Sequence, residues 1–254
     1  MSGEHGSTIQ NSSQIRTRLL LILIASFLIF LSPTNDAKAG YREDYRLGFS
    51  AFNKKDYTGA IKYLSKFLEQ TGSEKNKADH PRVYGTVFIH RARSYYSLGM
   101  HKEVIADSAK AISILPNEPS AHYLLGAGYL NIGEIEKAIS SFNQTIALQD
   151  DYIHAYLDRG TAYSRKTMFE EAERDFVQVL QIQPRNLHAN FNLGVLKAKQ
   201  EDFQKSIQFL NVAISILPDF APAFAARAHS NAALGNTVAA ERDLKMARKF
   251  GYDR

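Results

Sequence analysis

The stretch PSAHYLLGAGYLNIGEIEKAISSFNQTIALQDDY, residues 119–152, decides the fold. Its second half carries apolar side chains at Ile135, Ile139 and Phe142, a spacing of three or four residues that is typical of one face of an α-helix. Gly133 divides this half from a first half that is also rich in helix-forming residues. The stretch therefore predicts two amphipathic helices, over residues 121–131 and 134–148.

The same pattern recurs along the chain with a constant period. The period is 34 residues, which is the interval from Pro184 to Pro218. Pro116 precedes Pro184 by twice that interval. A column of small residues keeps the register: Ala92, Gly126, Gly160, Gly194 and Ala228. A second column follows it twelve residues later: Val104, Ala138, Ala172, Ser206 and Ala240. These columns predict repeats at 85–118, 119–152, 153–186, 187–220 and 221–254.

An earlier copy of the repeat fits Gly48, Ala60 and Leu64. The interval from Gly48 to Ala92 exceeds one period by ten residues, which form a polar insertion at 75–84. The first repeat therefore spans 41–74, and the chain is expected to hold six repeats. Glycine in the middle of a helix costs about 1 kcal/mol relative to alanine, so Gly126 predicts that two helices approach closely there, with Ala138 opposite.

The recurring Leu125, Gly126, Tyr129, Ala138 and Phe142 resemble the tetratricopeptide repeat family, and the resemblance covers residues 41–254. The resemblance implies an all-α fold, a right-handed superhelical solenoid of antiparallel helix pairs, in which stacked repeats share one core. It also implies a protein–protein interaction scaffold rather than an enzyme. The protein or peptide partner would lie in a concave groove lined by the first helix of each pair.

Candidate peptide-binding residues on these first helices are aromatic, basic or amide-bearing: Tyr45, Phe49, Arg93, Tyr96, Tyr123, Asn131, His154, Arg165, His188, Phe191 and Asn192. Aromatic anchors beside a basic side chain suit an extended or helical peptide that carries an acidic group. The alternative is that several of these side chains pack between repeats. Some family members grip a peptide's terminal carboxylate with Lys and Asn residues on three successive first helices. Asn192 alone matches that arrangement, so binding of cytosolic chaperone tails is not expected.

Other classes of site find little support in the sequence. Cysteine is absent, and no phosphate-binding glycine loop, paired-histidine metal motif or nucleophile elbow occurs, so we expect no catalytic residue and no cofactor. His154 and His188 occupy equivalent places in adjacent repeats but have no evident third ligand, so we expect no metal site. The net charge of +5 is spread along the chain without a basic tract, which argues against a nucleic-acid partner.

Residues 1–39 are predicted to be a signal peptide. The apolar run at 19–31 is 13 residues long, whereas a membrane span needs about 20, and Ala37-Lys38-Ala39 fits a signal-peptidase site. Cleavage after Ala39 would leave an exported protein, periplasmic or secreted. The alternative is that the run at 19–31 is retained and anchors the protein to a membrane.

The last repeat ends at residue 254, without the capping helix that many family members add. Its second helix is more polar than its counterparts, with Glu241, Arg242 and Lys245, so we expect it to cap the stack itself. The alternative is a second copy stacked on this end. That arrangement would make the chain a self-assembling structural component, a homo-oligomer built through its terminal repeats.

Overall fold

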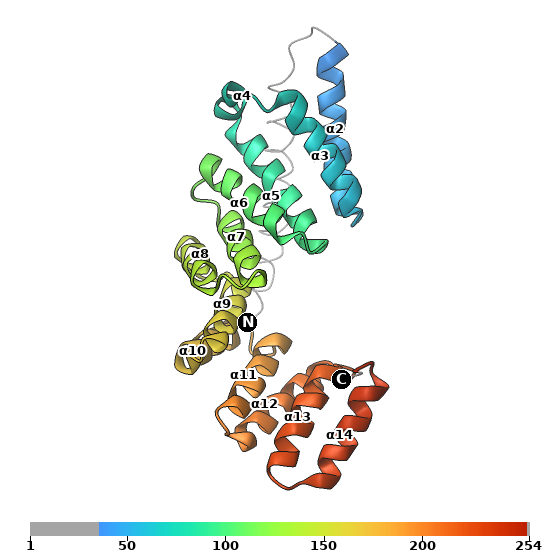
Figure 1. The fold of residues 1–254 in the computed structure, drawn as a ribbon, viewed down its shortest axis with the longest axis vertical. Coiled ribbons are helices and arrows are strands. Elements are labelled where there is room, and N and C mark those ends of the chain that lie inside the picture. The colour runs from blue at the N-terminus through green and yellow to red at the C-terminus, as the bar shows by residue number, and fades with distance from the viewer. Residues whose placement is uncertain (1–35, 253–254) are drawn as a thin grey trace, which may run out of the picture. The chain divides into compact units, whose positions relative to one another are not determined.

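The structure, a computed structural model, describes residues 36–252 (Figure 1). The described residues form helices and connecting turns, without strands. The apolar run at 19–31 and most of the predicted signal peptide lie outside the described residues. Within the described part, no helix is both long and apolar enough to span a membrane.

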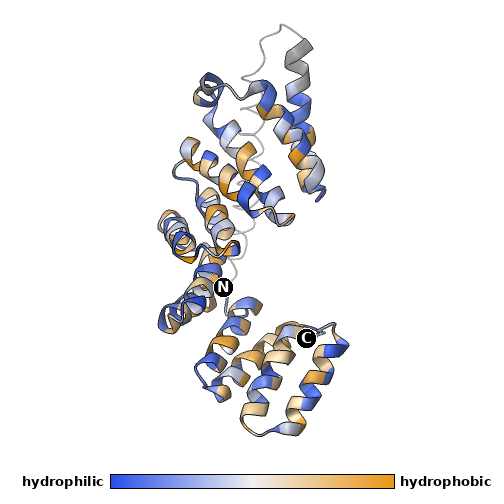
Figure 2. Cartoon of the chain, in the orientation of Figure 1, coloured by the Kyte–Doolittle hydropathy of each residue, from blue (hydrophilic) through white to orange (hydrophobic). Residues whose placement is uncertain are grey.

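The helices in chain order are α2 (Asp36–Asn53), α3 (Tyr57–Thr71), α4 (Glu74–Asp79), α5 (Pro81–Ser97), α6 (His101–Ile114), α7 (Pro119–Asn131), α8 (Ile135–Leu148), α9 (Ile153–Arg165), α10 (Phe169–Ile182), α11 (Leu187–Lys199), α12 (Phe203–Ile216), α13 (Ala221–Ala233) and α14 (Thr237–Lys249). Consecutive helices pack as pairs, so the predicted all-α solenoid of helix pairs is confirmed. Figure 2 shows the amphipathic character of the helices, which carry both hydrophobic and hydrophilic residues along their lengths. The chain divides into two compact units, the first ending at Val87 and the second beginning at Phe88.

In the first unit, α2 packs against α3 around the buried side chain of Phe67. The ring of Tyr45 lies 5.5 Å from that of Phe67, and the ring of Tyr84 lies 5.6 Å from it on another side. The Tyr84 hydroxyl donates a 2.7 Å hydrogen bond to the Thr71 carbonyl at the end of α3. The first unit thus has an aromatic core of its own.

The polar insertion is partly helical. The Ser73 side chain accepts a 3.2 Å hydrogen bond from the Asn76 backbone N–H and caps α4, a helix that the sequence did not predict. The next helix, α5, begins at Pro81, four residues before the predicted repeat boundary at 85. Proline favours the first position of a helix because its ring fixes φ and it has no N–H to leave unsatisfied.

In the second unit, the second helices α8, α10 and α12 each pack against their own first helix and against the first helix of the next pair. The first helices also contact one another, from α7 to α9, α9 to α11 and α11 to α13. This arrangement gives a continuous layer of first helices. A side chain on one first helix therefore contacts side chains on the next first helix, which lie about one repeat further along the chain.

The mid-helix glycines allow the two helices of a pair to approach closely. A Cβ atom at Gly126 would lie 2.7 Å from Cε1 of Phe142, and one at Gly160 would lie 2.6 Å from Cε1 of Phe176. The close approach was expected, and the nearest neighbours of that Cβ are the Phe142 ring and Ser141, ahead of the expected Ala138. The large apolar side chains of the second helices therefore lie directly against the glycines.

Each turn between the helices of a pair needs one residue with a positive φ. In the third pair this residue is Gly133, with φ of 85°, and in the fourth pair it is Thr167, with φ of 59°. The equivalent positions in the remaining pairs are occupied by Lys55, Gly99, Glu201 and Gly235, all with positive φ. Positive φ is strained for a β-branched residue, so Thr167 makes its turn less favourable than Gly133 does.

Buried arginine–aspartate pairs join the two helices in every second repeat. Arg159 on α9 donates to both oxygens of Asp175 on α10, from Nε at 2.9 Å and Nη2 at 2.6 Å. The pairs Arg91–Asp107 and Arg227–Asp243 have the same two-bond geometry and the same separation of 16 residues. Such two-bond contacts fix the orientation of the arginine and aspartate side chains and also pair their charges.

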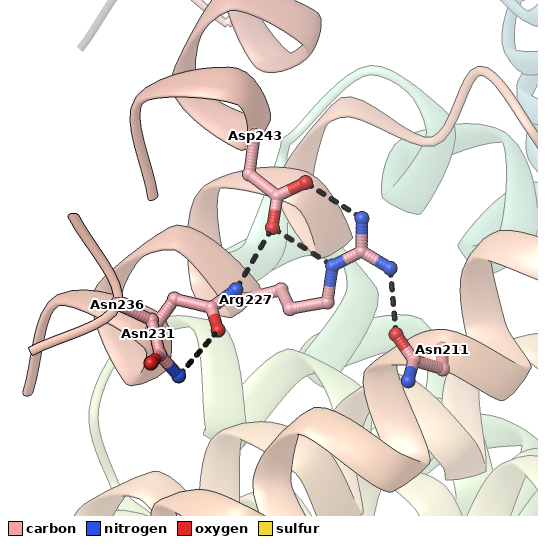
Figure 3. Close-up of polar contacts among 5 residues, drawn as sticks. All are labelled: Asn211, Arg227, Asn231, Asn236 and Asp243. Atoms are coloured by element: carbon pink, nitrogen blue, oxygen red, sulfur yellow. Dashed lines mark hydrogen bonds and ion pairs between the residues drawn. The ribbon is translucent and has the colours of Figure 1, made fainter. Parts of the chain in front are cut away.

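Figure 3 shows the last of these pairs. Arg227 bonds Asp243 on one side and donates from Nη1 to Asn211 Oδ1, at 2.6 Å, on the other. Asn231 donates a 3.2 Å hydrogen bond to the same carboxylate, and Asn236 in turn bonds Asn231. Arg159 makes the same additional contact: its Nη1 donates a 2.6 Å hydrogen bond to Oδ1 of Asn143 on α8, the preceding second helix.

In the repeats that lie between these pairs, the position equivalent to the arginine holds a leucine. The third repeat has Leu125 in place of the arginine and Ser141 in place of the aspartate. The fifth repeat has Leu193 and Phe209 at the same two positions. Each arginine also lies over an aromatic ring three residues before it, as the Arg159 guanidinium does at 5.4 Å from Tyr156, whereas the intervening repeats have His122 and Asn190 at that position. The packing of the second unit therefore alternates with a period of two repeats.

Candidate functional site

The central contact of the candidate site joins two first helices. The hydroxyl of Tyr123 on α7 donates a 2.9 Å hydrogen bond to Oδ2 of Asp158 on α9. These residues are 35 positions apart, one repeat and one residue, which brings them face to face when neighbouring first helices lie side by side. The contact therefore lies on the surface of the first helices.

Aromatic rings surround this contact. The ring of Tyr123 lies 5.2 Å from that of Tyr152 and 6.2 Å from that of His154. Tyr96, at the end of α5, is 37% exposed, and its hydroxyl accepts a hydrogen bond from the side chain of Asn131 on α7. We call the surface formed by Tyr96, Tyr123, Tyr152 and Asp158 the tyrosine face.

Asp158 is half-buried, and this burial raises the pKa of its carboxyl group. The hydrogen bond from Tyr123 and the positive charges of His154, Arg165 and His188 act in the opposite direction. Burial raises the pKa of Tyr123 strongly, with a further contribution from the Asp158 charge. Tyr123 therefore keeps its proton and acts as the donor to the carboxylate.

Basic side chains lie on both sides of Asp158 along the layer of first helices. Arg165, at the end of α9, donates from Nη1 to the Leu130 carbonyl at 3.1 Å and is exposed to solvent. Lys199 on α11 makes the equivalent contact one repeat later, with Ser164 Oγ at 3.2 Å. Arg93 on α5 lies near enough for its charge to act on Tyr152. The tyrosine face is thus an aromatic surface with one acidic group and basic groups beside it.

The structure brings most of the predicted binding residues together around Asp158, namely Arg93, Tyr96, Tyr123, Asn131, His154, Arg165 and His188. His188 and Phe191 on α11 also pack edge-on against Phe220, at 6.4 Å and 5.2 Å. Asn192 lies half-buried on the same helix. Tyr45 and Phe49 belong to the first unit, where their rings lie 4.6 Å apart and Tyr45 packs on Phe67.

Two residues of the site were missing from the sequence prediction. Tyr152 lies in the turn before α9, outside the first helices that were searched, and acts as the N-cap residue of α9. Asp158 is next to predicted residues in the fold, but its acidic side chain differs from the aromatic, basic and amide types that were predicted to bind a peptide. Its separation of 35 residues from Tyr123 is the signal that could have found it.

Among the described residues, no group of three or more His, Asp or Glu side chains is arranged to hold a metal ion. A hollow of about 310 Å³ lies between α9 and α10, lined by Tyr156, Tyr163 and Arg174 together with the Arg159–Asp175 pair. Its central charges already bond each other, so it offers a ligand little that is unsatisfied.

Comparison with known proteins agrees with this fold. Residues 157–223 and 44–70 match family models described as tetratricopeptide repeat. The crystal structure of a tetratricopeptide repeat protein from Parabacteroides merdae resembles this one with a TM-score of 0.70, over 83% of this chain and 80% of that chain, at 18% identity. This chain has the tetratricopeptide repeat fold. Tetratricopeptide repeat proteins generally bind protein or peptide partners, and the fold is generally non-catalytic.

Two further proteins show how far the likeness extends. YrrB, described as having an unusual peptide-binding site, matches with a TM-score of 0.56 and 22% identity over 71% of this chain and 88% of its own. Heat shock protein STI1 of Saccharomyces cerevisiae is 25% identical over 101 residues, or 40% of this chain. That match spans 16% of STI1, so it concerns a small part of that protein.

Proposed function

We propose that this protein is a scaffold that binds a segment of a partner protein along the tyrosine face. The observation that carries the proposal is the Tyr123–Asp158 contact, where rings and a carboxylate gather on the layer of first helices. Aromatic side chains contribute large contact areas at little entropic cost and are enriched among residues that dominate binding energy. The proposal is consistent with the general role of the tetratricopeptide repeat fold.

We also propose that the scaffold acts outside the cytoplasm. The support is the predicted signal peptide of residues 1–39, with its short apolar run and Ala37-Lys38-Ala39. Intact-mass measurement of the protein from the culture medium or periplasm tests this. A mass that begins at Gly40 is expected, and a mass that retains residues 1–39 contradicts cleavage and favours the membrane anchor.

Binding to the tyrosine face can be tested without knowing the partner. Peptides that bind the immobilised protein are selected from a random display library, and their affinities are then measured for face variants. Tyr96→Ala and Arg165→Glu should each weaken binding on the order of tenfold, a loss of about 1.4 kcal/mol. The matched control Arg174→Glu changes an arginine on α10 that is also exposed, and it should bind as the wild type does.

If the selected peptides bind both face variants with unchanged affinity, the tyrosine face is not the binding surface. Circular dichroism of each variant shows whether the fold is retained. Because Tyr96 and Arg165 are exposed, both variants should keep the helical content of the wild type.

The second candidate is a self-assembling component, and one observation favours it. Leu244 on α14 is 39% exposed, whereas the equivalent residues Phe142, Phe176 and Leu210 are at most 1% exposed. Val238, at the start of α14, is 71% exposed. A second copy stacked on α14 would cover both side chains. Sedimentation velocity over a range of concentrations tests this: association that Leu244→Glu abolishes supports it, and a monomer at all concentrations rejects it.

A further inference from the structure

The partner's chemistry can be inferred from Asp158, and this inference rests on the proposed function above. We propose that the tyrosine face recognises a lysine or arginine side chain of the partner segment, and that Asp158 is the ion-pair partner of that side chain.

Among the side chains that the structure describes, Asp158 forms no ion pair. The buried carboxylates Asp107, Asp175 and Asp243 each bond an arginine through both oxygens, and Asp44 bonds Lys66 at 3.2 Å. Among the described residues, Asp158 instead has the neutral Tyr123 hydroxyl as its hydrogen-bond donor, at Oδ2. A carboxylate removed from water without a cation is costly, and a ligand's cation would relieve that cost.

The rings around Asp158 also favour a cationic ligand. Burial raises the pKa values of Tyr96, Tyr123 and Tyr152, and all three also lie close enough to Asp158 for its charge to add to the rise. The faces of aromatic rings attract cations, and a carboxylate beside several rings adds a full opposite charge. The long apolar stem of lysine or arginine would also pack on the rings while its charged end reaches Oδ1.

The nearby basic residues limit which cationic segments fit. His154, Arg165 and His188 act on Asp158 through their charge, but none of them forms a salt bridge with it. Arg165 is turned to the Leu130 carbonyl. The Arg165 charge would repel a uniformly basic segment, so the fitting ligand has one basic residue for Asp158 and an acidic neighbour that faces Arg165.

The experiment is a double-mutant cycle between protein and peptide. A peptide selected against the wild-type protein is synthesised with its basic residue and again with norleucine at that position, which keeps the stem and removes the charge. Calorimetry measures both peptides against wild-type protein and Asp158→Asn. The asparagine side chain still offers an oxygen to the Tyr123 hydroxyl, so the fold is kept, as a melting curve will verify.

Norleucine should weaken binding to the wild type on the order of thirtyfold, while Asp158→Asn should bind both peptides with similar affinity. The control Asp150→Asn alters an exposed carboxylate just before α9, and it should behave as the wild type. Two results overturn the inference: selected peptides that share no basic residue, or a norleucine effect of equal size in wild type and Asp158→Asn. In either case, peptides that still lose affinity for Tyr96→Ala leave the proposed function standing. Peptides insensitive to Tyr96→Ala and Arg165→Glu reject the proposed function itself.

Discussion

The Tyr123 hydroxyl and the Asp158 carboxylate, 2.9 Å apart, connect the first helices of two adjacent repeats. A second polar contact joins the same two helices, from Arg165 to the Leu130 carbonyl at 3.1 Å. Both contacts span 35 residues of sequence, and the Lys199–Ser164 contact repeats that separation in the next pair. The candidate site therefore also contributes to the stacking of the repeats.

Replacing Asp158 by asparagine should stabilise the protein at neutral pH. Burial raises the pKa of Asp158 above the usual value of 3.8, so the folded protein holds this proton more tightly than the unfolded chain does. The contribution of Asp158 to the free energy of unfolding therefore falls as the pH rises from the usual pKa through the raised one. Asp158→Asn removes this contribution, and its advantage over wild type should shrink as the pH is lowered through that interval.

Urea denaturation of both proteins over a series of pH values measures this difference. Asp150→Asn serves as the control because Asp150 is exposed, and its curve should follow the wild type throughout. If Asp158→Asn is instead less stable at neutral pH, the neighbouring cations outweigh the burial of the carboxylate.

Removing one member of a buried arginine–aspartate pair should be costly. Arg159→Leu leaves the carboxylate of Asp175, whose side chain is 6% exposed, without its cation, and should cost about 3–5 kcal/mol. The double variant Arg159→Leu/Asp175→Ser copies the third repeat, which has Leu125 and Ser141 at these positions. It should recover most of that loss, because no buried charge remains. Chemical denaturation compares the three proteins, and a double variant as unstable as Arg159→Leu would contradict this account.

Glycine at position 167 should stabilise the turn between α9 and α10. Thr167 has φ of 59°, a conformation that costs a β-branched residue about 1 kcal/mol more than it costs glycine. Thermal denaturation of Thr167→Gly should therefore show a higher melting temperature. The reciprocal change, Gly133→Thr, places threonine at φ of 85° and should lower it. Equal melting temperatures for all three proteins would show that these turns do not limit stability.

The equivalent leucines Leu210 and Leu244 should respond differently to truncation. Leu210 is fully buried against Gly194, so Leu210→Ala should cost about 2–5 kcal/mol. Leu244 is 39% exposed, and Leu244→Ala should cost about 1 kcal/mol. Urea denaturation at low protein concentration measures both. A large loss for Leu244→Ala that depends on protein concentration would point to a partner copy covering this end.

The sequence predicted the helix pairs well because the repeat offers the same evidence many times. Small residues such as Gly126 and large ones such as Phe142 recur at fixed intervals, and each recurrence limits the register of the others. The short helix α4 was missed because it lies in the insertion, where no second copy exists for comparison.

The candidate site was harder to predict, since its contacts join different repeats. A search for residue types on single helices found Tyr123 but not Asp158, whose role depends on the neighbouring helix. The Arg159–Asp175 pair was missed for a related reason. The pair recurs in every second repeat. When repeats are aligned one by one, the arginines therefore share a column with Leu125 and Leu193, and the pattern is hidden.

This alternation has a consequence for how the gene could have grown. Arg91, Arg159 and Arg227 follow one another at intervals of two repeats, and Arg159 and Arg227 each reach an asparagine in the preceding repeat. Duplicating or deleting two consecutive repeats together would keep each arginine beside its proper neighbour. Gaining or losing a single repeat would place two like repeats together and separate an arginine from its asparagine. Viable length variants of this protein should therefore differ by an even number of repeats.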